Sequence, residues 1–270
     1  IKTDHCEIYF YEVKMKPIKK QLKLFKTIEL PSRYSLPNES NKVVNIPKYN
    51  PKLIMIEFDL TFFIFSRLTD YSFCITNKTG DEIKLYLCDC FVTCLAKGPN
   101  QNRSFLKGGA DGKITEYEIN DKNNFNNGDL NGIDVIFVRD FIGHKKEVTG
   151  IYYSDLLELI ITTGEDKKIF IRKYYDLSLL TLIDVDEFKI CVDVIINHNY
   201  LYMLFFENST NSHVVEVYSV NGLVLSRSKA ENQLINSIDF DKDGNLLIGN
   251  VKENKIEVYD PSLNKKITEI

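Results

Sequence analysis

The chain has 270 residues, of which 44% are apolar, 12% are aromatic and 27% are charged, and its formal net charge is −4. This is the composition of a globular, soluble protein. No apolar run approaches the roughly eighteen residues of a membrane span, and no basic stripe is present to neutralise a phosphate backbone. We therefore expect neither a transmembrane segment nor a nucleic-acid partner.

The cysteines fall mostly in apolar, strand-like runs, where cysteine behaves as a small hydrophobe. They are Cys6, Cys74, Cys88, Cys90, Cys94 and Cys191. No CxxC pair occurs among them, so we expect reduced thiols in an intracellular protein, without a metal site or a redox motif. The chain begins at Ile1 without a signal peptide, and we expect it to be a fragment of a larger protein.

One repeat unit is clear between residues 143 and 172. Gly143-His144 precede an apolar strand over 147–154, and a second strand ends in the small polar pair Thr162-Thr163. An acidic turn at Asp166 and a third strand over 168–172 follow. This is the order of a WD repeat.

Turn residues equivalent to that acid recur at intervals of roughly 41 to 55 residues, close to the repeat length of four-stranded blades. They are Asp70, Asp111, Asp166, Ser212 and Glu253. The longest interval contains the polar tract Asn120–Gly128, which we predict to be an inserted loop. The position of the WD tryptophan holds Thr76, Tyr117, Arg172, Tyr218 and Tyr259.

These repeats predict an all-β fold, a β-propeller of divergent WD-type repeats with about six visible blades and about seven in the full-length protein. We predict a single domain over residues 1–270, with an exposed loop over 31–49. It divides into half a blade at 1–30 and blades at about 51–89, 90–141, 145–185, 189–228 and 232–270.

The candidate site residues are structural. We expect His144, Thr162 and Asp166 to form a polar network across one blade, and Asp70 and Asp111 to hold the matching turns of two others. Arg172 is a poor substitute for the missing tryptophan, so strand packing should hold that blade more than the network does. No serine or cysteine nucleophile with an orienting acid can be placed beside His144, so we expect no catalytic residue and no enzyme.

Two segments imitate ligand-binding motifs. Asp239–Leu246 matches the first half of a calcium-binding EF-hand loop, but position twelve is Asn250, which cannot supply the bidentate carboxylate. We favour an Asp-Gly turn between two strands. Gly108–Lys113 has neither the spacing of a P-loop nor a following helix, and we predict a blade turn. No metal and no cofactor are expected.

Four motifs, in their order along the chain, carry a resemblance to a known family. They are Asp70–Phe73, Val92–Ala96, Gly143-His144 with the strands that follow it, and Val217–Gly222. Over about residues 61–262, the chain resembles the C-terminal WD-repeat propeller of BEACH-domain proteins, the beige and neurobeachin-like group.

The resemblance implies a non-catalytic protein-interaction scaffold in intracellular membrane and vesicle traffic. Its expected partners are other proteins, including a BEACH domain of the same polypeptide, and its expected location is cytoplasmic. Peripheral association with anionic lipids through Lys14–Lys26 is an alternative left open. The rival functions are a WD adaptor of a ubiquitin-ligase or coat complex and a propeller hydrolase.

Overall fold

The structure is a computed structural model of the whole chain. It describes residues 7–15, 20–29, 55–58, 62–67, 71–77, 83–99, 103–121, 133–228, 234–250, 252–263 and 265–269. The chain divides into two compact units, Ile1–Lys48 and Tyr49–Ile270. Asp70 and the loop predicted over 31–49 lie outside the described residues, as do the side chains of Lys14–Lys26.

The first unit contains an antiparallel pair of strands, β1 (Glu7–Met15) and β2 (Lys20–Glu29). This pair is called sheet A. The register shifts between Phe10 and Tyr11, where one strand carries an extra residue. The half blade expected over residues 1–30 stays a prediction.

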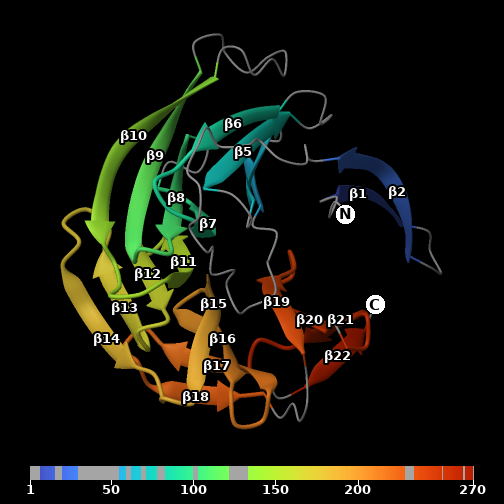
Figure 1. Cartoon of the computed structure of the whole chain (residues 1–270). Coiled ribbons are helices and arrows are strands. Elements are labelled where there is room, and N and C mark those ends of the chain that lie inside the picture. Colours follow the sequence, from blue (N-terminus) through green and yellow to red (C-terminus); the bar gives the residue numbers. More distant parts are fainter. Residues whose placement is uncertain are drawn as a thin grey trace. The chain divides into compact units, whose positions relative to one another are not determined.

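The second unit is built from four-stranded antiparallel sheets that follow one another along the chain (Figure 1). Sheet B comprises β3 (Met55–Phe58), β4 (Phe62–Arg67), β5 (Ser72–Asn77) and β6 (Ile83–Leu87). Sheet C comprises β7 (Val92–Lys97), β8 (Ser104–Gly109), β9 (Lys113–Asp121) and β10 (Ile133–Ile142). Sheet D comprises β11 (Val148–Ser154), β12 (Leu159–Gly164), β13 (Lys168–Lys173) and β14 (Leu179–Asp184).

Two further sheets complete the described part of this unit. Sheet E comprises β15 (Lys189–Asn197), β16 (Tyr200–Glu207), β17 (Ser212–Ser219) and β18 (Val224–Arg227). Sheet F comprises β19 (Ile235–Phe240), β20 (Leu246–Asn250), β21 (Lys255–Tyr259) and β22 (Lys266–Glu269). In each sheet the strands pair in sequence order, which short turns between antiparallel neighbours allow.

Burial falls steadily from the second strand of a sheet to the fourth. Every residue of β8 and of β12 is buried, whereas every residue of β22 is exposed. A strand is buried throughout only when both faces of its sheet are covered. The uninterrupted apolar run Leu159-Ile160-Ile161 in β12 is the sequence signature of that environment.

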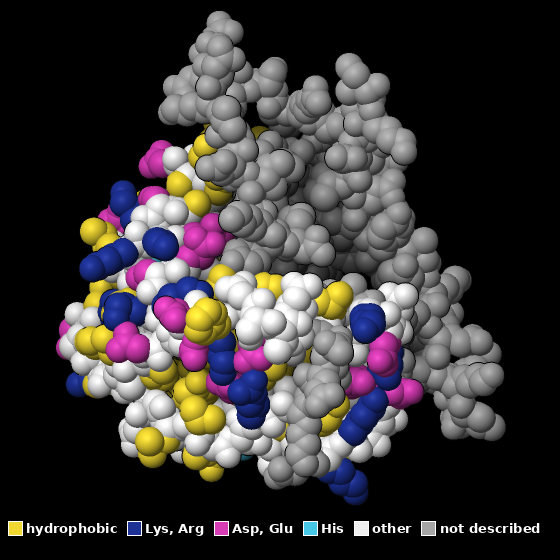
Figure 2. Space-filling view, turned by 60° about the horizontal axis from the view of Figure 1, so that its bottom comes forward, with side chains coloured by type: hydrophobic (Ala, Val, Ile, Leu, Met, Phe, Trp, Pro, Cys, Tyr) yellow, Lys and Arg dark blue, Asp and Glu magenta, His cyan; other side chains and the backbone are white. Residues whose placement is uncertain are grey.

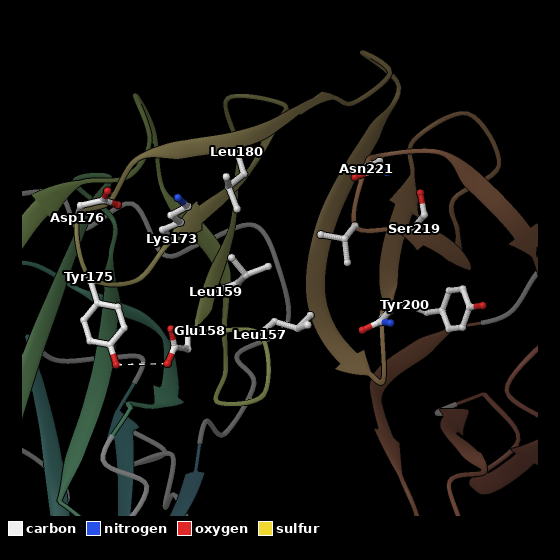
Figure 3. Close-up of a pocket in the computed structure, with 12 residues that line it drawn as sticks. Leu157, Glu158, Leu159, Lys173, Tyr175, Asp176, Leu180, Tyr200, Ser219 and Asn221 are labelled. Atoms are coloured by element: carbon white, nitrogen blue, oxygen red, sulfur yellow. Dashed lines mark hydrogen bonds between the residues drawn. The ribbon is translucent and has the colours of Figure 1, made fainter.

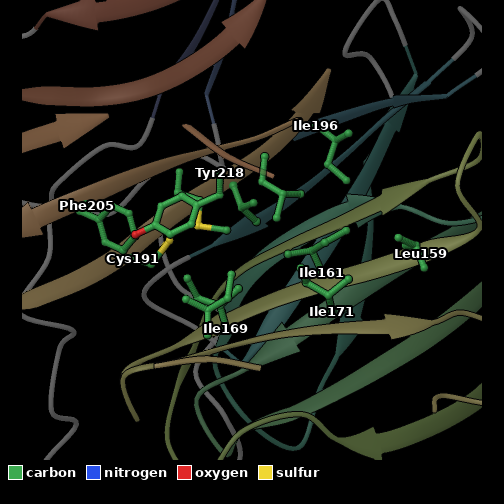
Figure 4. Packing of buried hydrophobic residues seen from close by; sticks show 12 residues of the cluster. Leu159, Ile161, Ile169, Ile171, Cys191, Ile196, Phe205 and Tyr218 are labelled. Carbon is green, nitrogen blue, oxygen red and sulfur yellow. The ribbon is translucent and has the colours of Figure 1, made fainter. Parts of the chain in front are cut away.

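Neighbouring sheets cover one another through shared apolar clusters. Between sheets D and E, Ile161 and Ile171 pack with Met203 and Phe205, all of them 0 or 1% exposed (Figure 4). The first strands β7, β11, β15 and β19 lie beside one another in that order. Sheets packed face to face in chain order are the blades of a β-propeller. The predicted fold class, an all-β propeller, is confirmed.

Sheets E and F each bury a glutamate on the third strand. The hydroxyl of Tyr218 donates to Glu216 at 2.8 Å, and the hydroxyl of Tyr259 donates to Glu257 at 3.1 Å. Lys189 and Lys266 neutralise these carboxylates, at 2.6 and 2.8 Å. Burial first, and then the bond to Glu216, raises the pKa of Tyr218. In these two repeats, tyrosine stands at the position of the WD tryptophan, and its hydroxyl binds a buried glutamate that is paired with a lysine.

The inserted loop begins later than the sequence suggests. Asn120 and Asp121 were expected in it, but they are the last residues of β9, where they pair with Asp134 and Ile133 of β10. The prediction is wrong for these two residues because cross-strand pairing with a long apolar neighbour overrides their low strand propensity.

No helix long and apolar enough to cross a bilayer is found in the part of the chain that the structure describes.

Because of the packing between sheets D and E, the loss of stability on replacing an isoleucine or leucine with alanine should depend strongly on its position in the sheet. Ile161→Ala should lower the free energy of unfolding by about 3 kcal/mol, because it leaves a cavity where the side chain is fully enclosed. Leu182→Ala, on the outer strand β14 of the same sheet and 41% exposed, should change it by less than about 1 kcal/mol. Urea denaturation of both variants measures the difference, and equal effects would contradict two-sided burial of β12.

Candidate functional site

The predicted polar network is assembled across sheet D. The ring of His144, 3% exposed, lies between two partners: Nδ1 is 2.8 Å from Asp166 Oδ1, and Nε2 is 3.0 Å from Thr162 Oγ1. The backbone N–H of Lys145 donates to Asp166 Oδ2 at 2.9 Å. The network thus links the loop before β11 to the turn between β12 and β13.

The protonation of this network follows from its partners. Burial lowers the pKa of His144 although Asp166 opposes the shift, so the imidazole is neutral at pH 7. Burial acts to raise the pKa of Asp166, but the donors Lys145 and His144 outweigh it and the pKa is lowered. An ionised carboxylate only accepts, so Nδ1–H donates to Asp166 and Nε2 accepts from the Thr162 hydroxyl.

Two glycines leave room for the histidine. Gly112 has φ of 80°, and its carbonyl oxygen accepts from the backbone N–H groups of Gly143 and His144. A Cβ at Gly112 would lie 2.2 Å from the carbonyl oxygen of His144, and one at Gly164 would lie 2.5 Å from the ring. The turn of sheet C therefore fixes the loop that carries the histidine of sheet D.

Arg172 stands where a WD repeat carries tryptophan, and its side chain does not join the network. The guanidinium of Arg172 lies 4.2 Å from the centre of the Phe170 ring, and its Nη1 has no hydrogen-bond partner in the described structure. Burial lowers the pKa of Arg172. Its charge also helps to lower the pKa of His144.

Asp111 occupies the matching turn of sheet C, where its carboxylate accepts from the backbone N–H of Lys113 at 3.1 Å. Within the described residues, no side-chain hydrogen bond joins Asp111 to His144, and Asp70 lies outside this part of the chain. Of the predicted blade turn Gly108–Lys113, Ala110–Gly112 join β8 to β9, whereas Gly108 and Gly109 end β8 and Lys113 begins β9.

The EF-hand-like segment folds as a turn between β19 and β20. Asp241 accepts from the backbone N–H groups of Asp243 and Asn245 and from the Asn245 amide, at 2.8 to 2.9 Å. Gly244 has φ of 81°. These bonds occupy the central carboxylate. Among the described residues, no group of three or more His, Cys, Asp or Glu side chains is placed to hold a metal ion.

A groove of 810 Å³ lies between sheets D and E (Figure 3). It is called the D–E groove and is formed by the turns that join first to second and third to fourth strands. Sheet D contributes Leu157, Glu158, Leu159, Lys173, Tyr175, Asp176 and Leu180, and sheet E contributes Asn199, Tyr200, Ser219, Val220 and Asn221.

The groove is mostly apolar and is open to solvent. Tyr175 is 69% exposed and Leu180 is 48% exposed, and the Tyr175 hydroxyl reaches Glu158 Oε1 only at 3.5 Å. Leucines on the outer strands away from the groove are also exposed, and Figure 2 shows apolar patches among charged side chains on the face it draws. Exposed apolar surface of this kind marks an interaction site in a folded protein.

A second, smaller hollow of 410 Å³ lies on the same side, between sheets E and F. One wall contains Asn197 and His198, which precede Asn199 of the D–E groove. The opposite wall is the segment Asp239–Gly244. The two hollows thus share the turn between β15 and β16.

The D–E groove cannot be recognised from the amino-acid sequence alone. Its signal is two pairs of exposed or half-buried leucines: Leu156-Leu157 in the turn between β11 and β12, and Leu179-Leu180 at the start of β14. The repeat pattern identified the turns, but only the packing of sheet D beside sheet E shows that Leu157 and Leu180 line one hollow.

Comparisons with known proteins agree with this architecture. A family model described as "WD domain, G-beta repeat" matches residues 136–172. One similar solved structure is that of the computationally designed Ika8 protein, at a TM-score of 0.56 and 14% identity, which shows likeness of fold alone. The match covers 81% of this chain and 61% of that one, so the chain spans less than two thirds of its length. A search of curated proteins finds no similar sequence.

Removing the Thr162 hydroxyl from the histidine network should lower the stability of the fold. Thr162→Val should lower the free energy of unfolding by about 2 kcal/mol, because it leaves the buried Nε2 of His144 without a donor. Thr181→Val, at a partly exposed position of β14, is the matched control and should change it by less than about 1 kcal/mol. Chemical denaturation of both variants tests this, and equal losses would contradict the network.

Glu147, in the loop that follows His144, should make the stability of the fold depend on pH. Burial, and then repulsion by Glu165, raises the pKa of Glu147 from its ordinary value of 4.5 to about 7. Between these pH values the folded state binds more protons than the unfolded state, so this group's contribution to stability falls as pH rises towards 7. The free energy of unfolding of Glu147→Gln, relative to that of the natural chain, should therefore rise by about 1–2 kcal/mol as the pH rises from 4.5 to 7.5. This figure is reduced for solvent screening, because Glu147 is only partly buried.

Thermal unfolding across that pH range, compared between the two chains, measures this gain. The opposite slope expected from the lowered pKa of His144 is common to both chains and cancels in the difference. A difference that stays constant with pH would contradict the raised pKa. Glu165→Gln should move the change to lower pH, because it removes the repulsion.

Proposed function

We propose that this β-propeller of WD-type repeats, a fold whose general role is to hold proteins on a scaffold, docks its partners in the D–E groove. The supporting observation is the exposure of Tyr175, Leu180 and Tyr200 around one hollow. Two rigid sheets form its walls, so a partner would meet a preformed surface and little ordering would oppose binding.

We propose that the scaffold is not an enzyme. His144 lies between an acid and a hydroxyl, the order of a catalytic triad, but Thr162 is 0% exposed and its oxygen is already hydrogen-bonded to the imidazole. A nucleophile enclosed in this way cannot reach a substrate. The network instead supports the blade whose turns form one wall of the groove.

We also propose that the scaffold belongs to a BEACH-type protein of intracellular membrane traffic, located in the cytoplasm and peripherally on intracellular membranes. The support is the order of the motifs from Asp70–Phe73 to Val217–Gly222. The sequence upstream of this chain in its transcript tests this proposal. A BEACH domain there would support it, and its absence from the complete open reading frame would overturn it.

Affinity purification of the intact protein tests docking in the groove. Leu180→Asp places a charge on the apolar wall, whereas Leu225→Asp, at 52% exposure on the outer strand β18, is the matched control outside it. A partner identified by mass spectrometry should bind the natural chain and the control equally. It should bind Leu180→Asp at least about tenfold more weakly in a direct titration, a loss of about 1.4 kcal/mol.

Unchanged thermal unfolding of both variants shows that the fold is retained, since exposed positions tolerate substitution. A photo-crosslinking amino acid in place of Leu180 should then attach covalently to the same partner. If every partner binds Leu180→Asp as tightly as the natural chain, docking in the D–E groove is wrong.

A further inference from the structure

The residues that line the D–E groove and the hollow beside it carry an excess of negative charge. The walls of the groove and of the hollow contain Glu158, Asp176, Asp239, Asp241 and Asp243, against Lys173 and Lys242. Five carboxylates against two ammonium groups leave a net charge of −3. Asp155, exposed in the turn before Glu158, adds another carboxylate beside the groove.

None of these carboxylates forms an ion pair among the described residues, although the charge of Lys173 acts on Asp176. Asp176 accepts only from the backbone N–H and hydroxyl of Ser178, and Asp241 accepts from its own turn. Glu158 has only the long contact from the Tyr175 hydroxyl. The turns therefore fix these charges in place without neutralising them.

Several acids elsewhere on sheets D, E and F form ion pairs, although Glu187, in the loop between β14 and β15, forms none among the described residues. Asp184 lies 2.6 Å from Lys168, Glu207 lies 2.7 Å from Arg227, and Glu269 lies 2.7 Å from Lys266. The acids at the two hollows therefore place negative charge without ion pairs next to exposed apolar side chains. An acidic rim around an apolar floor attracts cations and repels anionic lipid or nucleic acid.

We infer that the D–E groove binds a short segment of a partner protein in which leucine-like side chains alternate with or adjoin arginine or lysine. The inference rests on the proposed docking function and names its partner class. The apolar side chains fill the space between Leu157, Leu180 and Val220. The basic side chains meet Glu158 and the neighbouring acids at the rim, where charge sets the choice of partner and the rate of association.

A synthetic peptide tests this pairing on the whole chain. The probe is a short amidated, fluorescent peptide of leucines alternating with arginines, compared with one in which glutamate replaces arginine and one in which serine replaces leucine. Fluorescence anisotropy should show binding of the first peptide at least about tenfold tighter than of either control. Raising the salt from about 50 to about 500 mM should weaken it several-fold, because the rim charges are exposed.

Variants of the chain locate the site. Glu158→Lys and Leu180→Ser should each weaken binding of the leucine–arginine peptide by about tenfold. The matched controls are Glu187→Lys, an exposed charge in the loop between β14 and β15, and Leu225→Ser on β18, and they should leave it unchanged. Equal weakening by Glu158→Lys and Glu187→Lys would show attraction to the whole protein and would overturn the inference.

The outcomes separate this inference from the docking function. If the glutamate peptide binds as tightly as the arginine peptide, and both depend on Leu180, the groove docks partners but the inferred charge is wrong. If no peptide depends on Leu180, the inference is overturned, while a natural partner lost in Leu180→Asp would still support docking. If neither peptides nor partners depend on Leu180, both proposals are wrong.

Discussion

Face-to-face packing of neighbouring sheets is the constraint on which the rest of this structure depends. A four-stranded sheet can bury its second strand completely only when another sheet covers each face, and β12 meets that condition at every residue. Apolar clusters shared between adjacent sheets supply most of the stabilisation, since burial of apolar area is the dominant favourable contribution to folding. The outer strands lie beyond this cover, which explains why β14 and β18 carry exposed leucines.

Polar networks then adapt each repeat to the same packing in different ways. Sheet D uses His144 between Asp166 and Thr162, whereas sheets E and F use a buried glutamate paired with a tyrosine and a lysine. Both devices satisfy buried polar groups, and an unsatisfied one would be costly. Repeats can therefore lose the tryptophan of the WD pattern without losing the blade. The triplet Glu-Val-Tyr begins at Glu216 and again at Glu257, and it marks the glutamate–tyrosine network in the sequence.

Function is assigned to the turns because the sheets leave them free to vary. Strand pairing fixes where each turn lies, but the side chains at the turns contribute little to the core. In sheets D and E these positions hold leucine, tyrosine and unpaired acids, and they adjoin one hollow. The same turns in a scaffold without a partner would be expected to carry small polar residues. Their composition here supports binding of a segment that is both apolar and basic.

The sequence alone determined the strand content and the recurrence of turns, because alternating apolar strands and acidic corners are local features. It also identified His144, Thr162 and Asp166 as one group, since their spacing is that of a single repeat. It did not determine the end of β9, where Asn120 and Asp121 follow their cross-strand partners. Nor did it determine the D–E groove, because Leu157 and Val220 come from different sheets. Which turns meet is decided by how the sheets pack, and that depends on contacts between residues far apart in the chain.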